Sequence, residues 1–421
     1  MNFFQNMISS IVKRTLRLDT LGLKDFGVLH KDLNKATESV MSTTGEVSSL
    51  VYSEHLLDMI ENQNDDDLLE FLRNLVINYD VNTDILIKDT KSYAGEKNQK
   101  NYKKMTQSSE PKWLELFKRL NATSDGTSRL VKLRERMGVL RKDNLEIEAL
   151  DAGLLDLFKY WFNPSFLVLE KIDWSTPANV LEKIIAYEAV HEINSWDDLR
   201  ARLAPNDRQC FAFFHPLIPE EPLIFVEVAL CNSIPSSIQE VIKIEREEIN
   251  VEEASTAVFY SISNCQNGLS GISFGNFLIK KVAHKLKMEI PKLDVFVTLS
   301  PIPGFMNWLE KKAPMSYERC IDGIDIEEDL MKKAITYLTE SDREDKKPND
   351  SVARFHLGNG AILQQINLNA DLSKKGKAQS NGLMANYLYD LDVVEKNHEL
   401  FFKTKNVQIS DDIRSLKKKY S

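Results

Sequence analysis

The stretch that decides the fold of this chain is residues 256–281, TAVFYSISNCQNGLSGISFGNFLIKK. Its first eight residues are mostly β-branched, aromatic or small, which is typical of a buried strand. A turn of Gly and polar residues follows, and residues 277–288 then have the apolar spacing of an amphipathic helix. The stretch therefore predicts a strand, a Gly-rich turn and a helix in succession.

This turn has the chemistry of a phosphate cradle. Glycine lets backbone N–H groups approach an anion closely, and the N-terminus of a helix adds about half a positive charge. Gln266, Gly268 and Gly271 are therefore candidate binding residues for a phosphate or pyrophosphate, and Lys280 and Lys281 lie just inside the expected helix. The turn is neither a Walker A motif nor GxGxxG, so a purely structural turn is the alternative.

Further strands are expected on both sides of this stretch. Residues 210–215 and 223–230 are β-rich runs, and the Pro-Glu-Glu-Pro sequence at residues 219–222 is expected to join them as a hairpin loop. Residues 293–299 and the alternating residues 361–370 predict two more strands. Since strands and helices occur in both orders, the fold class is α+β with a mixed sheet.

The first part of the chain has a helical pattern. Leu68, Leu72, Leu75 and Val76 follow the i, i+4, i+7, i+8 spacing of an apolar helix face. Glycine and proline are sparse in this region, and no residue in it calls for a chemical role. We therefore expect a small helical bundle that serves interaction or scaffolding.

Composition shifts suggest where the domains divide. The polar run at residues 106–111 predicts a domain edge, which separates a helical domain at residues 19–108 from a catalytic domain at residues 109–421. The catalytic domain is expected to begin with further helices. Residues 1–18 are apolar and basic without an acidic residue, so they are a candidate mitochondrial targeting segment, with an ordinary amphipathic helix as the alternative.

The composition excludes several classes of protein. The chain has 421 residues, of which 43% are apolar and 28% charged, as in a globular protein with a sizeable core. A net charge of -9 argues against a broad nucleic-acid surface, and no apolar run is long enough to cross a bilayer. The four cysteines lack CxxC spacing and the seven histidines form no HExxH or HxH motif, so we expect no structural metal.

Two histidines are candidates for proton transfer. His356 lies in VARFHLGNG at residues 352–360, where the glycines and Asn359 predict a turn just before a strand. An imidazole is the side chain best able to exchange a proton near neutral pH. His215, in FFHP, competes for the role on chemistry alone.

Two serines follow the strand that ends at Leu230. Ser236 and Ser237 lie in LCNSIPSSIQ at residues 230–239, where either could cap the helix that follows. No GxSxG motif surrounds them, so a hydrolase triad is not indicated. We interpret LSPIPGF at residues 299–305 as a rigid, shape-setting turn.

These blocks together resemble the malonyl-CoA decarboxylase family. FFHPLIPEEPLIFVEVAL, IPSSIQ, FYSIS, GLSGISFGNFLIKKV, LSPIPGF, ARFHLGNGA and GLMANYLY occur in the order and spacing of that family between about residues 174 and 389. The resemblance implies a helical N-terminal domain used in oligomer contacts, followed by a mixed-sheet catalytic domain with the GCN5-related acetyltransferase (GNAT) fold. It also implies the conversion of malonyl-CoA and a proton to acetyl-CoA and carbon dioxide, which would regulate fatty acid synthesis and oxidation.

The resemblance implies particular site residues. It also implies no metal or organic cofactor, because the CoA thioester is itself the substrate. The essential histidine falls at His356 and the essential serine at Ser236, with Ser237 the weaker candidate. Tyr389 is implied as a hydroxyl group near the histidine. The substrate-lining segment corresponds to Asn206, Asp207, Arg208, Gln209, Cys210, Phe211 and Ala212. Within it, Arg208 would face an anionic group, while the Gly-rich turn would hold the CoA pyrophosphate.

The expected chemistry assigns one role to each group. His356 donates a proton, and Ser236 hydrogen-bonds the malonyl carboxylate and exchanges a proton with His356. A GNAT-type acyltransferase and a catalytically inactive acyl-CoA-binding scaffold are the alternative functions. The acyltransferase would need an acceptor amine and would not depend on a free carboxylate.

The resemblance also implies assembly and location. A homotetramer is expected, and the mitochondrial matrix is the expected compartment. Cytoplasm and peroxisome remain alternatives, although the final residues Lys419-Tyr420-Ser421 do not match the S-K-L peroxisomal signal. We expect neither a nucleic-acid partner nor a transmembrane segment.

Overall fold

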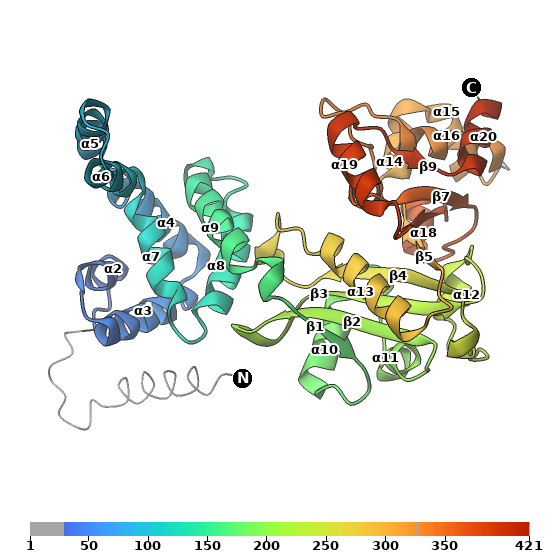
Figure 1. Ribbon diagram of the computed structural model, residues 1–421, viewed down its shortest axis with the longest axis horizontal. Helices are drawn as coiled ribbons and strands as arrows, with labels where there is room; N and C mark the ends of the chain where they lie inside the picture. Colours follow the sequence, from blue (N-terminus) through green and yellow to red (C-terminus); the bar gives the residue numbers. More distant parts are fainter. Residues whose placement is uncertain (1–28, 325–326, 421) are drawn as a thin grey trace. The chain divides into compact units, whose positions relative to one another are not determined.

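The computed structural model describes residues 29–324 and 327–420 (Figure 1). The candidate targeting segment at residues 1–18 lies outside these described residues. The chain divides into two units, which are described separately below. The helical unit contains the described residues up to Leu167 together with His215–Pro219 and Gln266–Ile272, and the sheet unit contains Val168–Phe214, Glu220–Cys265 and Ser273–Ser421.

The described part of the helical unit consists of α-helices and short 3₁₀ helices. They are α2 (Leu33–Ser42), α3 (Glu46–Glu61), α4 (Asp65–Asn78), α5 (Thr83–Gly95), α6 (Gln99–Ser109), α7 (Lys112–Asn121), α8 (Gly126–Leu140), η2 (Leu145–Ile147), α9 (Glu148–Trp161) and η3 (Pro164–Phe166). A further 3₁₀ turn, η5 (Asn267–Leu269), belongs to this unit although it lies far along the chain.

The predicted apolar helix face is confirmed in α4. Leu68, Leu72 and Leu75 are almost completely buried, and Asn64 caps the helix by accepting a hydrogen bond from the backbone N–H of Asp67. A buried cation ties two neighbouring helices together, because Arg129 of α8 forms ion pairs with three acidic side chains of α3. The helical character of the first part of the chain therefore follows the sequence pattern.

The expected domain edge at residues 106–111 differs from the structure. Helix α6 continues through this polar run to Ser109, and α7 begins at Lys112 directly after Pro111. The helical unit extends to Leu167, so α7, α8 and α9 belong to it rather than to the sheet unit. The physical reason is packing, since Trp113, Leu116 and Leu120 of α7 are buried.

The sheet unit is built on one mixed sheet. Its strands are β1 (Val168–Ile172), β2 (Arg208–His215), β3 (Ile218–Cys231), β4 (Thr256–Asn264), β5 (Val295–Thr298), β6 (Ser300–Pro301), β7 (Ile362–Asn367), β8 (Met384–Leu388) and β9 (Gln408–Ile409). The α-helices that surround the sheet are α10 (Ala178–Tyr187), α11 (Trp196–Leu203), α12 (Ile238–Ile242), α13 (Gly275–Glu289), α14 (Phe305–Lys312), α15 (Pro314–Ile321), α16 (Glu327–Thr339), α17 (Ser351–Gly358), α18 (Lys374–Ser380), α19 (Val394–Thr404) and α20 (Asp411–Tyr420).

Strand order and direction confirm the predicted mixed sheet. The order is β1-β2-β3-β4-β5-β8-β7-β9, with β6 pairing on β8. β3 and β4 are antiparallel, with Ile224 opposite Asn264, whereas β4 and β5 are parallel, with Thr256 opposite Val295. The strand, turn and helix predicted for residues 256–281 are present as β4, η5 and α13. The predicted fold class, a helical bundle followed by a mixed-sheet unit, is therefore confirmed.

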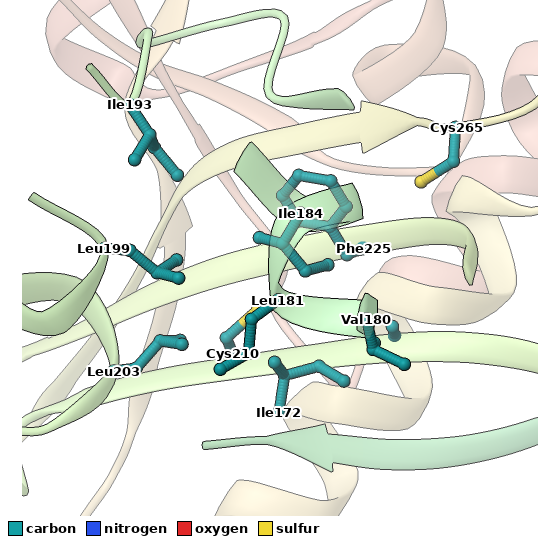
Figure 2. Packing of buried hydrophobic residues seen from close by; sticks show 11 residues of the cluster. Ile172, Val180, Leu181, Ile184, Ile193, Leu199, Leu203, Cys210, Phe225 and Cys265 are labelled. Carbon is teal, nitrogen blue, oxygen red and sulfur yellow. The ribbon is translucent and has the colours of Figure 1, made fainter. Parts of the chain in front are cut away.

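The two faces of the sheet are covered by different helices. Cys210 and Ala212 of β2 pack in one apolar cluster with Leu181 of α10 and Leu199 of α11 (Figure 2). Alternate residues of a strand point to opposite faces. Phe213 therefore points to the other face, where the Nζ atom of Lys281 in α13 lies 5.5 Å from the centre of its ring. Figure 1 shows α13 lying across the strands of this part of the sheet.

Two local predictions differ from the structure in their details. The loop between β2 and β3 consists of Pro216 and Leu217, whereas the expected loop residues 219–222 form the beginning of β3. The turn predicted just before a strand is present at Asn359 and Gly360, ahead of β7, but His356 itself lies in helix α17. Gly360 has a positive φ of 91°, which favours glycine. Among the described residues, no helix is both long and apolar enough to cross a membrane.

Candidate active site

His356 lies in the last turn of α17 and is only 2% exposed. The strand β8 and the residue after it place two tyrosines against its ring. Tyr387 stacks on the imidazole with ring centres 4.7 Å apart and an interplanar angle of 22°. Tyr389 places its hydroxyl 2.9 Å from Nδ1 of His356. The imidazole is thus held between aromatic rings, and one of its nitrogens meets a phenol.

The second nitrogen of His356 meets a serine. Nε2 lies 3.2 Å from Oγ of Ser300, which begins β6, and Ser300 in turn donates to Oγ1 of Thr298 at 2.8 Å. Because the Ser300 proton is directed to Thr298, the network assigns the proton on His356 to Nε2. Nδ1 then accepts a hydrogen bond from Tyr389. The result is a chain of hydrogen bonds that runs from Tyr389 through His356 and Ser300 to Thr298.

Burial sets the charge of these groups. Burial lowers the pKa of His356 from an ordinary value of 6.5 to about 3, because the charged imidazolium loses its hydration. The same desolvation raises the pKa of both Tyr387 and Tyr389 far above the usual phenol value. At neutral pH the pair of tyrosines and the histidine are therefore all uncharged.

A cavity of about 270 Å³ gives access to His356 and Ser300. Its polar groups include these two side chains and Tyr260, Asn264 and Ser351, and the rest of its wall is mainly apolar. The apolar lining is formed by Val190, Ile224, Phe259, Ile262, Pro301, Val352 and Phe355. One imidazole and one hydroxyl therefore converge on a mostly apolar space, which removes water from a group bound beside them.

Ser300 is one site residue that its sequence context does not single out. The motif LSPIPGF is interpreted from the sequence as a turn, whereas its serine lies against His356 and its first proline lines the same cavity. The available signal is a serine two residues after the end of the buried strand β5. That signal is weak in the sequence alone, because it does not show that residues 300 and 356 lie together in the fold.

Ser236 and Ser237 lie in the loop that precedes α12, and their predicted roles stay predictions. Ser236 is exposed and, among the described residues, makes no hydrogen bond to His356. Ser237 precedes α12 and its hydroxyl contacts the amide of Gln239. The loop is nevertheless tied to the site, because Asn386 of β8 donates both to the carbonyl of Pro235 at 3.4 Å and to that of Thr298 at 2.8 Å.

The segment expected to line the substrate forms the start of β2 and is mostly buried. Asn206 is exposed and Gln209 is half-buried, but the other members are buried in the sheet unit. The buried members are Asp207, Arg208, Cys210, Phe211 and Ala212. Arg208 donates to the carbonyls of Asp207 and Val241 at 3.0 and 2.8 Å, and Arg246 forms an ion pair with Asp207. The guanidinium of Arg208 is therefore engaged inside the protein.

The Gly-rich turn belongs to the helical unit. A Cβ atom at Gly268 would lie 1.9 Å from the carbonyl oxygen of Val131, so this glycine is required by the approach of α8. Arg134 of α8 donates to the carbonyls of Gly268 and Ser270 at 2.7 and 2.8 Å. Gly271 has a φ of 94° and is exposed, and Gln266 is half-buried. Binding of a pyrophosphate by this turn stays a prediction.

The remaining candidates have structural contacts of their own. His215 contacts the carbonyl of Trp161 at 2.9 Å through Nε2, and burial lowers its pKa. Lys280 pairs with Glu395 at 2.9 Å. Within residues 29–324 and 327–420, no three His, Cys, Asp or Glu side chains gather so that they could hold a metal ion.

Comparison with known proteins gives consistent matches over most of the chain. The family model described as the malonyl-CoA decarboxylase C-terminal domain matches residues 165–327 and 322–421, and that of the N-terminal domain matches residues 79–162. The chain is 33% identical to the mitochondrial malonyl-CoA decarboxylase of Anser anser anser over 351 residues, which are 72% of this chain and 69% of that protein. Its identity to the mitochondrial enzyme of Rattus norvegicus is 32% over 352 residues, or 73% and 71% of the two chains.

Solved structures agree with these matches. The malonyl-CoA decarboxylase of Rhodopseudomonas palustris superposes with a TM-score of 0.86 at 40% identity, covering 91% of this chain and 98% of that one. The enzyme of Agrobacterium vitis gives a TM-score of 0.86 at 42% identity, covering 92% and 99%. The similarity therefore extends over both units of the structure.

Proposed function

This chain belongs to the malonyl-CoA decarboxylase family, and we propose that its His356–Ser300 pair carries out the decarboxylation of malonyl-CoA to acetyl-CoA and carbon dioxide. The observation that carries the assignment of the pair is the 3.2 Å contact between Nε2 of His356 and Oγ of Ser300 in the wall of a cavity. Ser300 takes the role that the sequence analysis gives to Ser236. CoA is part of the substrate in this reaction.

The reaction needs an apolar surface next to hydrogen-bond donors. Loss of carbon dioxide breaks the bond between C2 and the carboxylate carbon, and the electron pair of that bond moves into the thioester as an enolate. An apolar wall favours the change from a localised carboxylate to neutral carbon dioxide. Phe259, Ile262 and Val352 supply such a wall in this cavity. A donor aimed at the thioester oxygen stabilises the enolate, and one such donor contributes about 3–4 kcal/mol.

The proton then has to reach C2. His356 is neutral, so its Nε2–H is the proton that it can supply, either directly or through the hydroxyl of Ser300. As Nε2 gives up this proton, Nδ1 takes the hydroxyl proton of Tyr389, so that the ring stays neutral. The tyrosinate regains a proton from solvent after product release. One proton is consumed per carbon dioxide released, and no covalent acyl-serine is formed.

Turnover without an acceptor tests the activity. Purified protein is given malonyl-CoA alone in heavy water, and carbon dioxide and acetyl-CoA are measured together. We expect the two products in equal amounts, with one deuterium in each acetyl group. Release of CoA that requires an added amine would instead support a GNAT-type acyltransferase. Binding of malonyl-CoA without any carbon dioxide would support an inactive acyl-CoA-binding scaffold.

We also propose the mitochondrial matrix as the compartment and a homotetramer as the assembly. The matched relatives from Anser anser anser and Rattus norvegicus are named as mitochondrial enzymes, and residues 1–18 are basic and apolar. Import of the full chain into isolated mitochondria, compared with a chain lacking residues 1–18, tests the location. Protection of the shortened chain equal to that of the full chain would contradict the role given to that segment. Sedimentation equilibrium tests the tetramer.

A further inference from the structure

We propose that Asp350 is a positioning residue that holds the helix carrying His356 and the segment carrying Ser300 in one fixed arrangement. This inference rests on the proposed function of the His356–Ser300 pair. Asp350 is completely buried and does not line the cavity, so it does not touch the reacting atoms. Its carboxylate instead joins the two segments that supply the pair.

One carboxylate oxygen caps the helix of His356. Oδ1 accepts hydrogen bonds from the backbone N–H groups of Val352 and Ala353 at 2.8 and 2.9 Å. Helix α17 has only eight residues, so it depends on its cap and on packing rather than on its own propensity. Val352 and His356 both line the cavity, so the cap sets the direction of the helix whose far end carries the imidazole.

The other carboxylate oxygen holds the segment of Ser300. Oδ2 accepts from the hydroxyl of Tyr337 at 3.3 Å and, in a long contact, from the backbone N–H of Gly304 at 3.5 Å. Gly304 directly precedes α14 and lies four residues after Ser300. A Cβ atom at Gly304 would lie 2.4 Å from the Tyr337 hydroxyl, so a side chain there would force the segment away from Asp350.

The surroundings of Asp350 suit a structural carboxylate. No ion pair involves it among the described residues, and its charge is met by these backbone and phenol donors and by the N-terminus of α17. Arg354, four residues on, directs its guanidinium to the carbonyls of Pro348 and Asn349. Removing the carboxylate would therefore free α17 and the Ser300 segment to shift relative to each other.

The variant Asp350→Ser separates the two contacts. Serine is as good a helix cap as aspartate, but one short hydroxyl cannot also reach Gly304 and Tyr337. We expect kcat for malonyl-CoA to fall by about 10- to 100-fold, as for a misplacement of catalytic groups by about 1 Å, while KM changes by less than about threefold. A kcat within about twofold of wild type would overturn the proposal.

Asp32→Ser is the matched control. Asp32 caps α2 in the helical unit by accepting from the backbone N–H of Lys35 at 2.9 Å, and among the described residues this exposed contact is the only hydrogen bond of its side chain. The same exchange should leave kcat unchanged there. An equal fall of kcat in both variants would show a general loss of stability and would overturn the positioning role.

A second pair of variants serves if Asp350→Ser does not fold. Gly304→Ala places a methyl group against the Tyr337 hydroxyl. In Gly304→Ala/Tyr337→Phe that hydroxyl is absent, and the ring atom Cζ lies 3.6 Å from the methyl group, which is an ordinary contact. The φ of Gly304 is -101°, so alanine is compatible with the backbone. We expect the double variant to recover most of the kcat that Gly304→Ala loses. If the fold-losses of kcat in Gly304→Ala and Tyr337→Phe simply multiply in the double variant, the proposal is contradicted.

A measurement without turnover separates this inference from the proposed function. In ¹⁵N-histidine-labelled protein, the signals of His356 are identified by their loss in His356→Asn. Asp350→Ser should shift the Nε2 signal, because the contact with Ser300 lengthens, and Asp32→Ser should not. An unchanged Nε2 signal would overturn the positioning role whatever the turnover. Wild-type protein that releases no carbon dioxide would refute the proposed function instead.

Discussion

His356 is a buried, neutral imidazole whose two nitrogens are both occupied. Tyr389 meets Nδ1 and Ser300 meets Nε2, at 2.9 and 3.2 Å. A group in this setting does not act as a solvent-exposed imidazolium acid, because burial lowers its pKa to about 3. It is suited to pass a proton along a hydrogen-bonded chain while it remains uncharged.

Replacing the imidazole should abolish chemistry while leaving binding. We expect His356→Asn to lower kcat by about 10²- to 10⁴-fold, the range for loss of a general acid. Binding of malonyl-CoA, measured by calorimetry, should stay within a few-fold of wild type. Equal losses of binding and turnover would reassign His356 to substrate positioning.

The two tyrosines at His356 provide a matched pair. Tyr389→Phe removes the phenol that donates to Nδ1, and we expect kcat to fall by about tenfold, a loss of about 1.4 kcal/mol. Tyr387→Phe keeps the ring stacked on the imidazole and removes a buried hydroxyl that has no hydrogen-bond partner among the described residues. That variant should keep its kcat and unfold at the same or a higher temperature. The reverse ranking would contradict the proton path.

Sequence reasoning finds part of this site and misses part of it. His356 and Tyr389 lie in recognisable motifs, and the structure places them in contact. Ser300 is missed because its motif is typical of a turn, and because its contact with His356 joins residues that are 56 positions apart in the sequence. Ser236 has the more suggestive local context, yet it is exposed.

Helix α17 shows why local sequence misleads at the scale of an element. The turn predicted from Gly358, Asn359 and Gly360 is present, but nothing local shows that His356 belongs to a helix before it, whose start is set by the buried cap Asp350. The Gly-rich turn is a related case. The absence of a side chain at Gly268 suits a phosphate as well as a neighbouring helix, and the structure shows that α8 approaches it. A glycine can thus make room either for a phosphate or for a neighbouring helix, and only the packing in the structure distinguishes the two.

Gly268→Ala should therefore act on stability. Its methyl group would meet the carbonyl of Val131 at 1.9 Å, and overpacking of this kind costs about 1–3 kcal/mol. Gly138 lies in α8, the helix that contains Val131. A methyl group at Gly138 would meet no atom within 4 Å, so Gly138→Ala should raise the free energy of unfolding by up to about 1 kcal/mol. Urea unfolding measures both. An unchanged unfolding free energy in Gly268→Ala, with a raised KM, would instead favour direct contact of this turn with the pyrophosphate.

At the scale of the whole molecule, buried histidines make stability depend on pH. Burial lowers the pKa of His356 to about 3 and that of His191 to about 4, from 6.5. Between these values the unfolded chain binds protons that the folded chain does not, so stability is lost as the pH falls below about 6.5. The slope approaches about 1.4 kcal/mol per pH unit for each histidine.

A variant without these two imidazoles should be less sensitive to acid. We expect His356→Asn/His191→Asn to lose less unfolding free energy than wild type between pH 7 and pH 4.5, as measured by urea unfolding at each pH. The comparison is between slopes, since the double variant starts from a different stability. Parallel slopes in the two proteins would contradict the neutral burial of these groups.

The division of the whole chain into a helical part and a mixed sheet follows from its periodicity. The apolar repeat of α4 and the β-rich run of β4 are both strong patterns, and both are confirmed. The boundary at Leu167 is not visible in the same way, because the helical pattern of α7 to α9 does not show which unit these helices pack in. The edge of a domain depends on which neighbouring elements bury the apolar face of each helix. A single sequence does not show those neighbours.

The most direct test is the rate of carbon dioxide release from malonyl-CoA by Ser300→Ala, with Ser236→Ala assayed beside it. If the imidazole and the hydroxyl on the cavity wall form the reacting pair, Ser300→Ala slows release by about 10²-fold or more with little change in KM, and Ser236→Ala stays near wild type. Release that persists in Ser300→Ala and collapses in Ser236→Ala would place the chemistry at the other serine.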